Sequence, residues 1–162
     1  MLRVMETIRN SIYADSLVSQ TSDLMNWINE ILAGVWVHQV ILLNFHLFPT
    51  STYCQQANGT LLNVLDDPTS FADSSSTALL SSVTYRMAAL MNDTTHLASA
   101  NSALYLVSQS LDVNGWLQNT VNPYSFWTPT STGGYSVEGQ AFVLLMHAAW
   151  RDYMQSIGGS AQ

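Results

Sequence analysis

The feature that most restricts how this 162-residue sequence can fold is a repeated segment. Residues 58–68 read NGTLLNVLDDP and precede Ser70-Phe71, and residues 114–123 read NGWLQNTVNP and precede Ser125-Phe126. The two copies begin 56 residues apart, at Asn58 and Asn114. Each has an Asn-Gly turn, where glycine tolerates a positive φ, and a short extended stretch that ends at a proline. A repeat of this length predicts stacked supersecondary units that share one core.

Apolar periodicity predicts long helices around the two copies. A helix capped by Ser74 or Ser75 and a second helix should form a helical hairpin around a turn at Asn92-Asp93-Thr94. The chain would begin within a preceding unit. The first two expected helices are Met1–Arg9 and a helix after Ser22-Asp23 whose apolar stripe is Leu24, Trp27 or Ile28, Ile31 and Val35. The hairpin helices are 74–91, with the apolar residues Leu79, Leu80, Val83, Met87, Ala88, Leu90 and Met91, and Leu97–Leu111. The last expected helix is 136–156, with the apolar residues Ala141, Phe142, Leu144, Leu145, Ala148, Ala149 and Tyr153.

The segment Val40–Gln55 interrupts the register of the repeat, which would be restored without it. It is apolar at first and contains Pro49 and the single cysteine, Cys54. One interpretation is a translated intron or an error in gene prediction, which transcript sequencing across the junction would test. The other is a natural loop insertion at a hairpin connection.

Composition excludes several classes of protein. Four arginines and no lysine stand against eleven acidic residues, a formal charge of −7, so the chain has no basic surface for nucleic acid. Hydrophobic residues make up 48% and charged residues 9%, which argues against disorder. Ser, Thr, Asn and Gln carry the polarity, as is typical of secreted proteins.

Neither a membrane span nor a signal peptide is expected. The longest apolar run, Val40–Phe48, is broken by Asn44 and His46 and is shorter than the roughly 20 residues that a membrane helix needs. The first residues, MLRVME, are interrupted by charge, and no small-residue cleavage site follows. Since Cys54 stands alone, no internal disulfide or thiolate metal cage can form.

The sequence lacks the spacing that metal or nucleophilic catalysis requires. No HExxH motif joins His38, His46, His96 and His147, so no metal is expected, and no GxSxG motif indicates a nucleophilic serine. Asp66 and Asp67 precede Pro68 on an extended segment, where neighbouring side chains point to opposite faces. They therefore predict a turn rather than a catalytic carboxylate pair.

Several segments resemble the six-hairpin glycosidases of glycoside hydrolase families 88 and 105. Residues 58–79, from Asn58-Gly59 through Asp66-Asp67-Pro68 to Leu79, resemble a connection in that fold. Asn114-Gly115-Trp116-Leu117, SVEGQAF at 136–142 and AWRDY at 149–153 resemble its closing hairpin, especially in fungal members. Residues 1–5 resemble the tail of an inner helix. The likeness covers nearly the whole chain except Val40–Gln55.

The resemblance implies an all-α fold, a partial (α/α)6 barrel or toroid that corresponds to roughly the C-terminal half. Residues 1–162 would form a single partial glycosidase domain with an atypical insertion at 40–55. The implied function is hydrolysis of unsaturated uronyl oligosaccharides from pectin or rhamnogalacturonan, without metal or organic cofactor. In the family an aspartic acid protonates the vinyl ether of the sugar and helps to activate water.

The resemblance places the catalytic aspartates upstream of Met1, so none maps onto this chain, and the fragment is expected to have little or no activity by itself. A full-length parent would be extracellular. The partner is an oligosaccharide, with no nucleic acid and no membrane, and the oligomeric state stays open. The alternative function is a non-catalytic helical-repeat module that binds a partner or a sugar through its concave side.

Five residues are candidates for binding the substrate. Each also has a structural interpretation: Glu138 suits a helix N-terminus, Asp73 suits a helix cap, and tryptophans in connections often anchor packing. Trp127 and Tyr124 are further candidates for stacking on sugar rings, whereas Trp27, Trp150 and Tyr153 are expected in the core. The five candidates are Glu138, Gln140, Ser136, Trp116 and Asp73.

Overall fold

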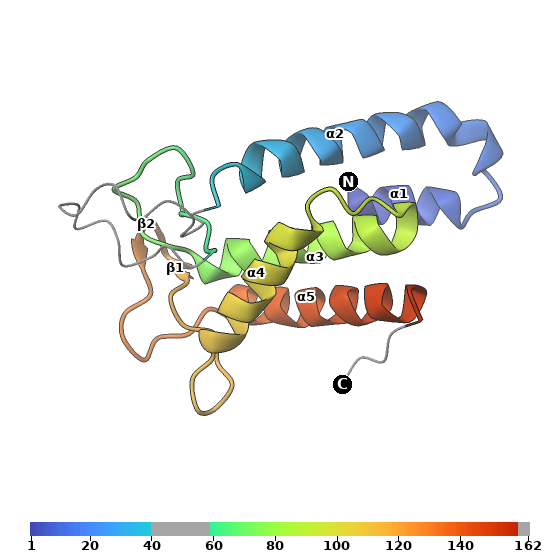
Figure 1. Cartoon of the computed structure of the whole chain (residues 1–162). Helices are drawn as coiled ribbons and strands as arrows, with labels where there is room; N and C mark the ends of the chain where they lie inside the picture. The colour runs from blue at the N-terminus through green and yellow to red at the C-terminus, as the bar shows by residue number, and fades with distance from the viewer. Residues whose placement is uncertain (40–58, 159–162) are drawn as a thin grey trace, which may run out of the picture. The chain divides into compact units, whose positions relative to one another are not determined.

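The structure is a computed structural model that describes residues 1–39 and 59–158 (Figure 1). The chain divides into two compact units, Met1–Val37 and a second that begins at His38. The proposed insertion at 40–55 lies outside the described residues, as do Asn58, Cys54 and His46.

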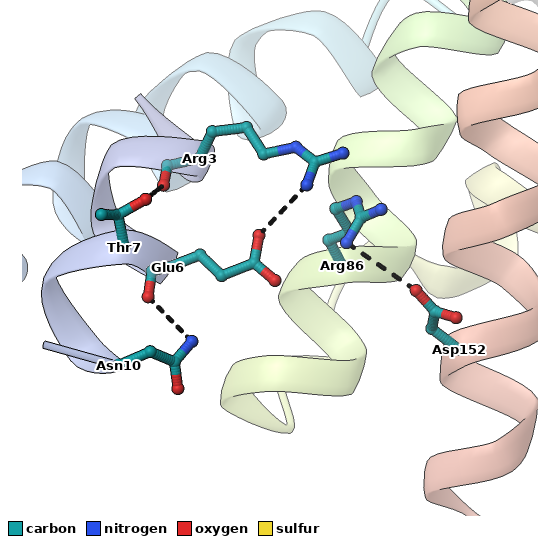
Figure 2. Close-up of polar contacts among 6 residues, drawn as sticks. All are labelled: Arg3, Glu6, Thr7, Asn10, Arg86 and Asp152. Carbon is teal, nitrogen blue, oxygen red and sulfur yellow. Dashed lines mark hydrogen bonds and ion pairs between the residues drawn. The ribbon is translucent and has the colours of Figure 1, made fainter.

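The first unit is a helical hairpin. Helix α1 spans Leu2–Arg9, a short 3-10 turn (η1) spans Asp15–Leu17, and helix α2 spans Val18–Trp36 and packs against α1. Within α1, Arg3 and Glu6 form an ion pair of 3.7 Å, and the Asn10 side-chain amide donates to the Glu6 carbonyl at 3.0 Å (Figure 2). The helix expected at Met1–Arg9 is confirmed.

Helix α2 corrects two expectations. It begins at Val18, so Ser22 and Asp23 lie inside the helix and do not cap it. Trp27 is 53% exposed and is not a core residue. The buried side chains of α2 start with Ile28. In a helix of 3.6 residues per turn, the neighbouring side chain of Trp27 points about 100° away from Ile28, so Trp27 lies outside the buried stripe. The buried residues of α2 are Ile28, Leu32, Val35 and Trp36.

The second unit packs three helices. Helix α3 spans Ser74–Met91, α4 spans Leu97–Gln109, and α5 spans Val137–Ser156. Helix α3 contacts both of the others, and α3 and α5 lie side by side and run in the same direction (Figure 1). The three predicted helices are therefore confirmed. Their shared core consists of Ala78, Tyr85, Ala100, Leu106, Val107, Leu117, Val143, Met146 and Ala149.

Burial within these helices differs from the predicted apolar stripes. Leu144, one of the apolar residues of the predicted last helix, is 66% exposed. On α3 many of the buried positions carry hydroxyl groups rather than large apolar side chains. Several of these hydroxyls donate to carbonyls of their own helix, as Ser81 does to Thr77 at 2.7 Å and Ser82 to Leu79 at 2.6 Å, which offsets the cost of burying them.

The turn between α3 and α4 forms as predicted. Asn92 ends α3 in the left-handed conformation, with φ of 55°. Tyr85 on α3 donates to the Asn101 side chain on α4 at 2.8 Å, and burial, with a smaller effect from Tyr153, raises the pKa of Tyr85 above its ordinary value. Arg86 on α3 forms an ion pair of 3.8 Å with Asp152 on α5 (Figure 2).

A small antiparallel β-hairpin lies between α4 and α5, in a stretch that the sequence did not predict to pair. Strand β1 spans Val121–Asn122 and β2 spans Ser125–Pro129, with an irregular register between Val121 and Asn122. The backbone N–H of Thr130 donates to the Thr120 carbonyl at 2.8 Å and continues the pairing. The hairpin lies near the N-terminal ends of α3 and α5 (Figure 1).

The two repeated segments have equivalent structures. Gly59 has φ of +100° and Gly115 has φ of +83°, the left-handed conformation that glycine tolerates best. A side chain at either position would be strained. The glycines of the two Asn-Gly pairs therefore perform the same backbone function in both copies.

The equivalence extends to the side chains beside each turn. Leu61 and Leu117, at matching positions of the two copies, are 0% and 1% exposed. The N–H of Leu61 donates to the Thr77 hydroxyl at 3.0 Å, and the N–H of Leu117 donates to the Gln140 side-chain oxygen at 2.9 Å. Both acceptors stand four residues after the N-cap of the following helix, so each repeat couples its turn to that helix in the same way.

The N-terminal ends of α3 and α5 approach closely at Gly139. A Cβ added there would lie 3.2 Å from Cβ of Ser75, 3.3 Å from Cβ of Ser136 and 3.1 Å from Cγ2 of Thr120. Two of these atoms are fixed to the backbone, and Thr120 is fully buried, so none can move away freely. Glycine at this position permits the close packing of the two helices.

We therefore expect Gly139→Ala to lower the free energy of unfolding by about 1–3 kcal/mol, because the added methyl group overpacks this contact. Gly34→Ala is the matched control, since Gly34 lies inside α2 with nothing within 4 Å of an added Cβ. There alanine should stabilise by about 0.5–1 kcal/mol through helix propensity. Urea denaturation measures the stability of both variants. If the two substitutions changed the free energy of unfolding in the same direction, the close packing of α3 and α5 at Gly139 would be contradicted.

Among the described residues, no helix has the length and hydropathy required to span a bilayer.

Candidate functional site

The N-terminal end of α5 carries three of the predicted site residues. Ser136 is the N-cap, is 4% exposed, and accepts from the N–H of Gly139 at 3.0 Å. Glu138 is exposed in the first turn, where the helix dipole favours its negative charge, and its carboxylate lies 3.4 Å from the Ser136 hydroxyl. The cap thus fixes the backbone beneath Glu138 and leaves the carboxylate accessible to a ligand.

Gln140 holds the second Asn-Gly segment against α5. Its side-chain oxygen accepts from the N–H of Leu117 at 2.9 Å, and its side-chain nitrogen donates to the Gly115 carbonyl at 3.0 Å. Both ends of the amide therefore have backbone partners. These contacts make Gln140 a positioning residue for the adjacent Trp116, and its contact with sugar stays a prediction.

Trp116 stacks on Tyr135, with the ring centroids 4.8 Å apart and the rings inclined by 30°. Trp116 is 36% exposed and Tyr135 is 44% exposed, so the pair keeps accessible aromatic surface. The backbone N–H of Trp116 donates to the Asp112 carboxylate at 2.9 Å, which fixes the turn that carries the ring. Tyr135 and Glu138 stand on either side of the Ser136 cap in the chain, and on that basis we call Trp116, Tyr135 and Glu138 the α5 cluster.

The α5 cluster consists of an accessible aromatic pair and one exposed carboxylate. Aromatic rings pack against the apolar face of a ligand, while a carboxylate accepts hydrogen bonds from hydroxyl groups. Glycoside hydrolysis by paired acids requires two suitably placed carboxyl groups. The cluster therefore fits substrate recognition better than bond cleavage.

Asp73 is the N-cap of α3, which corrects the predicted cap at Ser74 or Ser75. Its carboxylate accepts from the N–H groups of Ser75, Ser76 and Val121 at 3.0, 3.0 and 3.1 Å, and from the Ser75 hydroxyl. Only 3% of Asp73 is exposed. The capping interpretation is confirmed, and the predicted sugar contact of Asp73 stays a prediction.

The expected turn at Asp66-Asp67 is confirmed. The Asp67 carboxylate accepts from the Thr69 hydroxyl at 2.7 Å and from the Thr69 N–H at 2.9 Å. The hydrogen bond from the Thr69 hydroxyl, followed by that from its N–H, lowers the pKa of Asp67. Asp67 therefore stabilises its own turn.

Two exposed aromatic residues were not predicted from the sequence as binding-site candidates. Tyr135 is the partner of Trp116, and Phe126 lies in β2 beside the predicted candidate Trp127, with which it makes an edge-to-face contact at 4.9 Å. Tyr135 stands in a loop rich in Ser, Thr and Gly, and Phe126 lies in a short strand flanked by Ser, Thr and Pro, so neither has an apolar segment around it. That local composition was the available signal. Tyr124 and Trp127, which the sequence did suggest, are 97% and 76% exposed.

Within residues 1–39 and 59–158, no three His, Cys, Asp or Glu side chains come together in a way that could hold a metal ion.

Comparison with known proteins gives a likeness of fold. No family profile matches the sequence, and no curated protein matches it. A solved structure described as a possible member of the GH105 family, from Salmonella enterica serovar Paratyphi A, superposes with a TM-score of 0.60 and 17% sequence identity. The match covers 96% of this chain and 36% of that one, so this chain spans about a third of its length. The predicted fold class is thereby confirmed: this chain has an all-α fold that forms part of an (α/α)6 toroid.

Proposed function

We propose that this chain is part of a glycoside hydrolase that acts on unsaturated uronyl oligosaccharides from pectin or rhamnogalacturonan. The observation that carries the proposal is the superposition of 96% of the chain on the possible GH105 member. The resemblance of residues 58–79, 114–117, 136–142 and 149–153 to families 88 and 105 supports it. A fungal, extracellular parent protein is part of the same proposal.

In this proposal the chain recognises substrate, and the residues that cleave the bond belong to hairpins that precede Met1 in a longer protein. Trp116 offers a ring face to a sugar, and Glu138 accepts from its hydroxyls. The Asp73 carboxylate already accepts four hydrogen bonds and the Asp67 carboxylate accepts two, which suits structural roles. An acid that gives up and regains a proton needs a less saturated environment.

A non-catalytic binding module is the second candidate. The observation that favours a binding module is that the aromatic rings are accessible while the carboxylates of Asp73 and Asp67 already accept hydrogen bonds within a helix cap and a turn. The two candidates differ in their ligand. A hydrolase fragment should bind the unsaturated disaccharide, whereas an unrelated module has no reason to prefer it.

We expect this chain to bind an unsaturated galacturonyl-rhamnose disaccharide without hydrolysing it. Calorimetry measures binding, and the loss of ultraviolet absorbance of the unsaturated sugar measures turnover. Trp116→Ala should weaken binding about tenfold, since buried aromatic anchors dominate recognition. Tyr105→Ala, which removes an exposed ring on α4, is the control and should bind normally.

Two results would contradict the proposal in different ways. Rapid turnover by this chain alone would show that the catalytic groups lie within it. Absence of binding, or equal binding by the wild type and Trp116→Ala, would remove the α5 cluster from substrate recognition.

A further inference from the structure

The β-hairpin presents three accessible aromatic side chains. Tyr124, Phe126 and Trp127 are 97%, 54% and 76% exposed, and we call them the hairpin aromatics. Phe126 and Trp127 meet edge to face, at 87°, so their rings offer two differently oriented surfaces. Exposed aromatic groups of this size indicate a binding surface when they gather on one element.

Hydrogen bonds hold the backbone of the hairpin in place from several sides. The Asn63 side-chain amide, from the first repeat, donates to the Phe126 carbonyl at 2.9 Å. The N–H of Val121 donates to the buried Asp73 carboxylate at 3.1 Å, and the N–H of Tyr124 donates to the Asn122 side chain at 2.9 Å. A frame built in advance lowers the entropy lost when a ligand binds.

The electrostatics around the hairpin disfavour an anionic ligand. Between residues 59 and 158 the only arginines are Arg86 and Arg151, and there is no lysine. Arg86 stands twelve residues after Ser74, which is roughly 18 Å along α3 from the end that carries the hairpin. The segments at that end contribute Asp66, Asp67, Asp112 and Glu138 instead. A phosphate or uronate group would meet negative charge without a compensating cation.

The size of the surface favours a small ligand over a second protein. An aromatic side chain buries about 200 Å² when fully covered, so at their exposed fractions the hairpin aromatics offer roughly 450 Å². A stable protein interface needs about 800 Å² from each partner. The apolar faces of a few pyranose rings fit the smaller area, and the hairpin also contains polar residues, Asn122, Ser125 and Thr128.

We infer that the hairpin aromatics bind neutral sugar rings, with Trp127 as the principal stacking platform. The choice of carbohydrate rests on the proposed function, but the site is separate from the α5 cluster. In a mixed polysaccharide fragment, this surface takes the uncharged residues, and the uronate carboxylate is recognised by groups that the described residues of this unit do not supply.

Calorimetric titrations with galactotetraose, xylotetraose, cellotetraose and tetragalacturonate test this inference. At least one neutral tetrasaccharide should bind more tightly than tetragalacturonate, with an affinity that added salt leaves unchanged. Trp127→Ala should weaken that binding tenfold or more, and Tyr105→Ala should leave it unaltered. Circular dichroism of the variants checks that they fold as the wild type does.

The inference is overturned if no neutral tetrasaccharide binds, if Trp127→Ala binds as the wild type does, or if tetragalacturonate binds most tightly. It is also overturned if sedimentation shows a dimer that Trp127→Ala dissociates, because the surface then belongs to a second copy. Tetrasaccharide binding without disaccharide binding would reject the proposed function alone. The opposite result would reject this inference alone.

Discussion

Leu117→Ala is expected to lower the free energy of unfolding by about 3 kcal/mol, because it removes a fully packed side chain and leaves a cavity. Leu117 is 1% exposed and belongs to the core that α3, α4 and α5 share. Its backbone is held by the bridge to Leu111 and by the hydrogen bond to Gln140, so the site cannot easily collapse around the smaller residue. Urea denaturation of both proteins measures the difference.

The repeat supplies an internal comparison for this result. Leu61 occupies the matching position in the first copy and is also fully buried, so Leu61→Ala should cost a similar amount. Leu144→Ala is the control, since Leu144 on α5 is largely exposed and should change stability by less than about 0.5 kcal/mol. A small effect at Leu117 beside a large one at Leu61 would contradict the structural equivalence of the two copies.

Asp73→Ala should destabilise the protein by about 3 kcal/mol, which combines a lost helix cap with buried donors left unpaired. The carboxylate of Asp73 joins the first turn of α3 to Val121, at the start of the β-hairpin. Without it, the N–H of Val121 and the N–H of Ser75 lose their acceptor. The midpoint of urea unfolding should fall accordingly.

Asp67→Ala separates this effect from the loss of negative charge. Asp67 is partly exposed, and among the described residues its carboxylate accepts from Thr69 of its own turn, so its removal should cost less than about 1 kcal/mol. Hydrogen exchange of Val121 should rise in Asp73→Ala and stay unchanged in Asp67→Ala. Equal effects of the two substitutions would mean that the buried network is not what stabilises this region.

The helical organisation could be predicted because it follows from local patterns. The left-handed turn at Asn92, the cap at Ser136 and the positive φ of Gly115 each depend on the chemistry of a few adjacent residues. The end of α5 at Ser156, before Gly158, follows the same rule. Local propensity and apolar period agree in these segments, which makes the prediction consistent.

The cap of α3 illustrates where such patterns stop. Ser74, Ser75 and Asp73 are all good capping residues, and the sequence offered all three for this role. Asp73 caps the helix because its carboxylate also accepts from Val121, which lies 48 residues away in the chain. Ser74 instead donates to the carbonyl of Gln118 at 2.6 Å. Hydrogen-bond partners that are distant in the chain therefore determine which of the three neighbouring residues caps α3.

The sequence alone was sufficient for the long helices and for the glycine turns of the two repeated segments, because turn chemistry and helical period are encoded over spans of a few residues. Tertiary structure decided which face each helix buries, since the buried hydroxyls of α3 and the exposed Trp27 and Leu144 depend on neighbours remote in the chain. It also brought Tyr135 onto Trp116 and Phe126 onto Trp127. Such contacts form only when the helices pack and bring these segments together, so they cannot be predicted from patterns in the adjacent sequence.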